Sequence, residues 1–231
     1  MHIRKHHPML QTHHLVKIAL IVLCAASNSC KSMSKPTPLD SSSVIAPLNV
    51  YESPQDRSLA IKYYSNLENI YNRIRSHFNP SKLEFFMISG ICFRRLQMEK
   101  TFDLYLSLNT KSPQVFQEDE TTFEQRAAAI FKSYIKQLLV IAAQEKAILN
   151  DEVVTGIMVN SRWQIETILN PQYHSVSFEQ LTFVAPKKEV NDYVNHLITD
   201  QELVNRSILI ALQNGETPRV ITLSLEEAQV S

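Results

Sequence analysis

The chain has 231 residues, with 23 basic and 23 acidic side chains and a formal net charge of zero at pH 7. Residues 1–29 carry three basic and no acidic side chains, so the remainder is mildly acidic and has no long-range attraction for nucleic acid. The chain contains only three glycines, which excludes Gly-rich phosphate loops, dinucleotide fingerprints and nucleophile elbows.

The first thirty residues have the pattern of an export signal. Basic residues Arg4, Lys5 and Lys17 accompany an apolar run over residues 15–26. This run is too short to cross a bilayer as a helix, which needs about 20 apolar residues. We therefore expect residues 1–29 to be a cleaved signal peptide.

The small residue Ser29 followed by Cys30, after an apolar core, resembles the lipobox of bacterial lipoproteins. The resemblance covers about the first thirty residues and departs from the usual pattern at Ser27 and Asn28. It implies that Cys30 is lipidated, becomes the mature N-terminus and anchors the chain to a membrane. Lys31 stands where enteric lipoproteins retained in the inner membrane carry Asp, so the resemblance favours the outer membrane in a cell that has one.

Two other interpretations of this segment stay open. General signal peptidase cleavage before Ser27 or Cys30 would release a soluble periplasmic or secreted domain, and lack of cleavage would leave a membrane anchor. Cys24 lies in the part expected to be removed. Lipidation of Cys30 leaves Cys92 as a single thiol in an apolar strand, which we expect to be a small buried hydrophobe.

Histidines are concentrated in the export signal and predict no metal site. His2 and His6 have a spacing that could bind a metal on a helix, but they belong to the segment expected to be removed. His77, His174 and His196 are too far apart in sequence to suggest a site. We therefore predict no metal and no cofactor.

Residues 30–52 are rich in Ser, Pro and Thr, which is typical of a flexible tether. A single α+β domain is expected over residues 53–228. It begins with Ser53 and Pro54, a capping residue and a first-turn proline, and an apolar stripe predicts a helix as far as Asn79.

A β-hairpin is expected next. Residues 83–96 favour a strand, with Gly90 marking a bulge or close packing, and residues 101–108 alternate between apolar and polar. Arg94 and Arg95 near the turn are candidate contacts for a ligand or partner, and a solvated strand end is the structural alternative.

A long helix is predicted from a capping box at Thr121–Glu124 to about Leu149. Its apolar stripe is the cleanest in the chain, so we expect this helix to be the structural centre. The acidic residues 118–120 before it suit the helix dipole and a solvated loop.

Residues 153–165 and 176–184 are predicted as two further strands, joined by a turn or loop. Trp163 and Arg162 near a strand end are candidate contacts for a ligand or partner. Packing of the tryptophan over a helix is the structural alternative.

The C-terminal part of the chain again has the order of a helix followed by two strands. Pro186 starts a shorter helix, Thr199–Glu202 forms a second capping box, and residues 208–212 and 220–225 flank the hairpin signal Asn214–Gly215. The order αββαββαββ predicts an α+β fold in which helices cover a mixed or antiparallel sheet.

No sequence motif nominates a catalytic residue, and neither paired cysteines nor His-Glu-x-x-His occurs. We predict a non-catalytic binding or scaffolding module of the bacterial envelope, with another envelope protein as partner. A cofactor-free exported hydrolase is one alternative, and a cleft with convergent carboxylates, His or Ser would favour it. A small-ligand-binding lipoprotein is the other, favoured by a deep apolar pocket reached by Trp163 or the first-helix tyrosines.

Overall fold

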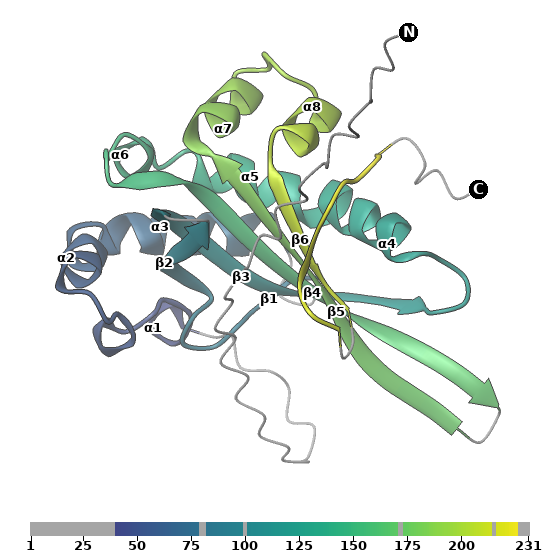
Figure 1. The fold of residues 1–231 in the computed structure, drawn as a ribbon. Coiled ribbons are helices and arrows are strands. Elements are labelled where there is room, and N and C mark those ends of the chain that lie inside the picture. The colour runs from purple at the N-terminus through teal and green to yellow at the C-terminus, as the bar shows by residue number, and fades with distance from the viewer. Residues whose placement is uncertain (1–39, 79–81, 99–100, 171–172, 214–215, 226–231) are drawn as a thin grey trace, which may run out of the picture.

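The computed structural model describes residues 40–78, 82–98, 101–170, 173–213 and 216–225. The expected signal peptide, Cys30 and the Asn214–Gly215 turn lie outside these residues. The described residues form an α+β fold with a seven-stranded mixed sheet, which confirms the predicted class (Figure 1). None of the described helices is long and apolar enough to cross a membrane.

The sheet combines one parallel strand pair with antiparallel pairs. The strand path is β1 (Glu84–Phe85), β3 (Thr101–Gln117), β4 (Val154–Asn170), β5 (Tyr173–Pro186), β6 (Ile208–Leu212) and β7 (Arg219–Ile221), with β2 (Ile91–Met98) also paired to β3. Strands β3 and β4 are parallel, because the helical connection between them returns the chain to the same end of the sheet. The three expected hairpins are the antiparallel pairs β2–β3, β4–β5 and β6–β7.

The folded domain begins earlier than the predicted boundary at residue 53. Residues 40–52, expected to belong to the tether, contain two short helices, α1 (Ser41–Val44) and η1 (Leu48–Val50). Ile45 and Tyr51 are buried, and Ile45 forms a parallel bridge with Ile91 of β2. A few apolar side chains in a Ser- and Pro-rich stretch are enough to pack this segment against the sheet edge.

The predicted first helix is divided into α2 (Pro54–Lys62) and α3 (Tyr64–His77). Ser53 caps α2 as expected, since its hydroxyl accepts a hydrogen bond from the Gln55 N–H. The division falls at Tyr63, whose ring packs on Phe93 with centroids 6.2 Å apart. Its hydroxyl donates to Asp151 at 2.8 Å, so the side chain joins this helical layer to the turn before β4.

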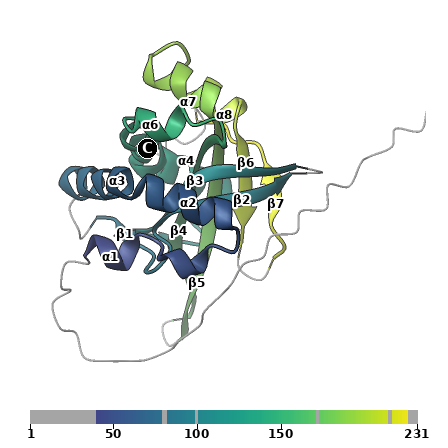
Figure 2. The same cartoon turned by 90° about the vertical axis from the view of Figure 1, so that its left-hand side faces the viewer.

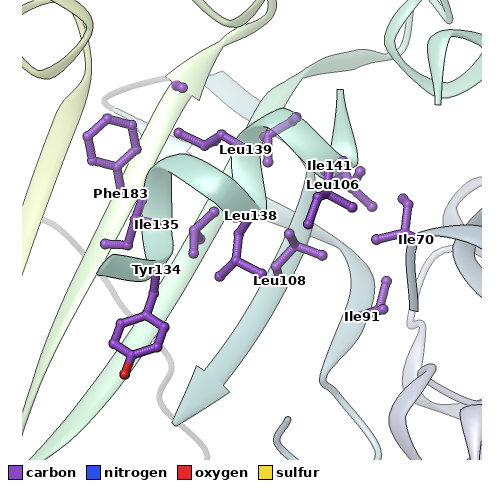
Figure 3. Close-up of a cluster of buried hydrophobic side chains, with 14 of the residues drawn as sticks. Ile70, Ile91, Leu106, Leu108, Tyr134, Ile135, Leu138, Leu139, Ile141 and Phe183 are labelled. Carbon is purple, nitrogen blue, oxygen red and sulfur yellow. The ribbon is translucent and has the colours of Figure 1, made fainter. Parts of the chain in front are cut away.

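The central helix runs as α4 (Phe123–Ile130), a π-helical turn η2 (Phe131–Ile135) and α5 (Lys136–Ala142), followed by a separate α6 (Lys146–Leu149). Its capping box uses Thr122 and Gln125, one position later than predicted. Figure 3 shows Ile135 and Leu138 packing toward Leu106, Leu108 and Phe183 of the sheet. All five side chains are fully buried, which confirms this helix as the structural centre.

The β4–β5 hairpin extends beyond the rest of the sheet. Strand β3 ends beside Glu166, at Gln117, while β4 and β5 continue pairing to Asn170 and Tyr173. Figures 1 and 2 show the two strands projecting away from the helices as an arm. Two helices follow β5, α7 (Lys187–Val194) and α8 (Asp200–Asn205), and α8 begins with the predicted Thr199–Glu202 capping box.

We expect Ile45→Ala to lower the free energy of unfolding by about 2–5 kcal/mol, the cost of truncating a buried aliphatic side chain. Leu48→Ala is the control, because Leu48 is 44% exposed and its truncation should change stability by less than about 0.5 kcal/mol. Urea unfolding followed by circular dichroism measures both values. A loss below about 0.5 kcal/mol in Ile45→Ala as well would mean that Ile45 does not contribute to the core.

Candidate partner-binding surface

Strand alternation separates neighbouring side chains of β4 onto opposite faces of the sheet. Trp163 points to the helical face, and Arg162 points to the face away from the helices. The register places Arg162 beside Lys111 of β3 and two positions from the Gln164–Phe178 pair. The sequence-predicted pair Arg162 and Trp163 therefore belongs to two different environments.

On the helical face, Trp163 is fully buried at the base of the arm. Its indole Nε1 donates to Glu179 Oε2 at 2.9 Å, and its ring lies 5.6 Å from that of Phe123. Arg126 of α4 donates two hydrogen bonds to the same carboxylate, at 2.9 and 2.8 Å. Trp163 thus packs over the central helix and presents no surface to a partner.

On the opposite face, two cationic side chains lie over one aromatic ring. The Arg162 guanidinium is 4.1 Å from the centre of the Phe178 ring, and Lys111 Nζ is 5.7 Å from it. Neither cation forms a hydrogen bond or ion pair with another described residue. Arg162 therefore keeps its guanidinium donors free while the aromatic ring holds it in place.

Further along the arm the same face becomes apolar. Val176 is 54% exposed and Ile168 is 56% exposed. Glu166, which pairs with Val176 in register, accepts hydrogen bonds from the Gln117 and Gln164 side chains at 3.2 and 3.1 Å. We define the arm face as the surface formed by the side chains of Lys111, Arg162, Phe178, Val176 and Ile168.

Toward the body of the sheet, a row of hydrogen-bonded polar side chains adjoins the arm face. Gln180 donates to the Thr182 hydroxyl at 3.3 Å, Thr182 donates to the Asn160 side-chain oxygen Oδ1 at 2.6 Å, and the Asn160 side-chain nitrogen donates to Asn109 Oδ1. Thr182, Asn160 and Asn109 are buried. These side chains supply hydrogen-bond donors and acceptors to one another, and the resulting network fixes their positions across β3, β4 and β5.

Cys92 lies at the end of this row and is buried, as expected. The Asn109 amide nitrogen is 3.7 Å from its sulfur. Burial raises the pKa of the Cys92 thiol, which keeps it in the unreactive protonated form at neutral pH.

The two other sequence-predicted contact residues lie away from the arm face. Arg95 forms a bidentate ion pair with Asp56, at 3.0 and 2.8 Å, and so joins β2 to α2. Arg94 is exposed and pairs in register with Tyr105, six positions before Lys111 on β3. Sequence reasoning did not nominate Lys111 or Phe178, because only the register of three strands brings them to Arg162.

Two hollows open on the helical side of the domain. One, of about 530 Å³, is lined by His77, Phe78, Lys82, Ser133 and Tyr134. The other, of about 610 Å³, lies between α5 and the α7–α8 pair, where Asp200 binds Lys136 at 3.2 Å and Tyr193 at 2.8 Å. Neither lining includes Trp163 or a first-helix tyrosine.

Within the described ranges, no group of three or more His, Cys, Asp or Glu residues could hold a metal ion.

Comparison with protein-family models finds no match, and the searches of curated proteins and of solved structures find no significant match either. The functional assignment of the arm face therefore depends on its geometry, exposure and charge. Its free cations distinguish it from Arg95 of β2 and Arg126 of α4, each of which is paired with a carboxylate.

We expect Glu179→Gln to lower the free energy of unfolding by about 3–5 kcal/mol, because it leaves the buried Arg126 charge without its counter-ion. Trp163 is the only tryptophan, so its emission should shift as its carboxylate partner is removed. Urea unfolding followed by fluorescence measures both effects. Glu124→Gln, at an exposed pair with Arg219, is the control and should cost no more than about 1 kcal/mol. Similar losses in the two variants would argue against a buried ionic contact.

Proposed function

We propose that this chain is an exported envelope protein, lipidated at Cys30, whose α+β domain binds another envelope protein without catalysing a reaction. The basic and apolar leader followed by Ser29–Cys30 supports export and lipidation. The arm face carries the binding role, since it combines exposed apolar side chains of the β4–β5 hairpin with two cations, Lys111 of β3 and Arg162 of β4, that form no ion pair with a described residue. Arginine and aromatic side chains, here Arg162 stacked on Phe178, are enriched at protein interfaces.

Hydrolysis receives less support from the geometry. The smaller hollow contains His77 and Ser133, but no hydrogen bond joins them among the described residues, and its lining has no carboxylate. A serine nucleophile needs an adjacent base that a third group orients. We therefore regard the hollow as a surface feature and the arm face as the functional surface.

The lipidation step is tested by the intact mass of the mature protein isolated from its native host. We expect a diacyl or triacyl group on Cys30, and loss of both the lipid and membrane association in Cys30→Ala. Separation of inner and outer membranes then locates the protein. An unmodified mass beginning at Ser27 or Cys30 would contradict lipid anchoring and indicate a soluble exported domain.

The non-catalytic role is tested with a broad panel of ester, amide, glycoside and phosphate substrates. We expect equal background turnover by the native protein and by the Ser133→Ala and His77→Ala variants. Both side chains are exposed, so neither substitution should disturb the core. Turnover that disappears in either variant would instead establish a hydrolase.

A further inference from the structure

We infer that the arm face recognises a carboxylate side chain of its protein partner through Arg162, with Val176 and Ile168 making the adjoining apolar contact. The inference depends on the proposed function only in taking the partner from the cell envelope. It adds the recognition chemistry and the residues that carry it.

Arg162 has the geometry of a preorganised carboxylate receptor. Its guanidinium is stacked on Phe178 at 4.1 Å, and none of its donors is used by another described residue. A planar guanidinium binds a carboxylate through two parallel hydrogen bonds, and stacking reduces the conformational entropy lost when they form. Lys111, on the same ring, adds a second positive charge beside the site.

The charges of the arm favour a protein over an anionic membrane surface. Glu166 lies on the arm face between Arg162 and Ile168, whereas Glu118 accepts a hydrogen bond from Thr167, which alternates onto the opposite face. A uniformly anionic bilayer laid on the arm face would be repelled by the Glu166 carboxylate, whereas a protein can place one carboxylate on Arg162 and apolar groups further out.

The base of the arm limits its movement relative to the body. Trp163 and Glu179, on β4 and β5, are bound to each other, and Arg126 of the central helix binds Glu179 with two hydrogen bonds. The arm face is therefore presented by a hairpin fixed to the core. The hairpin therefore loses less conformational entropy when a partner binds, which favours a higher affinity.

The test uses the full chain in its native host, with a photo-reactive amino acid in place of Val176. We expect irradiation to yield a cross-linked protein adduct, identified by mass spectrometry. The same amino acid in place of Ile61, which is 61% exposed on α2, is the positional control and should give no such adduct.

The contribution of Arg162 is measured by adding Arg162→Gln to the Val176 cross-linking variant. We expect the adduct yield to fall about tenfold or more, consistent with the loss of charge-assisted hydrogen bonds. Arg206→Gln is the charge-matched control and should leave the yield unchanged, since Arg206 is exposed at the C-terminal cap of α8, away from the arm face. Unchanged Trp163 emission in both variants verifies that the arm base is intact.

Once the partner is identified, a charge exchange tests the carboxylate directly. Arg162→Glu should abolish the adduct, and replacing the contacted partner carboxylate by arginine should restore it. An adduct to lipid alone, or a protein adduct that is insensitive to Arg162, would overturn the inference.

The two proposals fail in different ways. A lipidated protein that cross-links from Ile61 but not from Val176 would retain an exported, lipid-anchored binding protein and overturn the role of the arm face. An unlipidated protein whose Val176 adduct depends on Arg162 would retain the arm face and overturn the lipid anchor.

Discussion

Burial of the central helix against β3, β4 and β5 determines which side chains of the sheet are free for other contacts. Once Leu138 and Ile135 cover Leu106, Leu108 and Phe183, alternate residues of these strands must face the other way. That face carries Lys111, Arg162 and Phe178. The hydrophobic packing of one face therefore specifies the position of the cationic cluster on the other.

The buried Arg126–Glu179 pair is better understood as a positioning element than as a source of net stability. Desolvating two charges costs free energy that their attraction only partly offsets, although removing one partner is strongly unfavourable. In this domain the carboxylate also accepts the Trp163 N–H, so one side chain joins α4, β4 and β5. The conformation of the arm base is thereby restricted to arrangements that satisfy all three groups.

The sequence predicts elements whose signals are local. Alternation locates the hairpins, and hydroxyl–carboxylate spacing locates the start of α8 at Thr199. Arg162 could be nominated from its neighbour Trp163, but its functional partners Phe178 and Lys111 could not, because their proximity depends on the register of three strands. The sequence placed the start of the domain too late, at residue 53, because Ile45 and Tyr51 are isolated apolar residues whose burial depends on tertiary contacts.

The earlier domain boundary also limits the partners available to a lipidated form of this protein. Cys30 lies ten positions before Asp40, the first residue that the structure describes, and ten fully extended residues span at most about 33–36 Å. A tether that continued to residue 52 would reach roughly twice as far. In the lipidated form proposed above, this shorter reach would confine the arm face to a smaller volume above the membrane and so raise its effective concentration toward membrane-bound partners. A carboxylate-bearing protein held at the same membrane therefore suits this architecture better than a freely diffusing one.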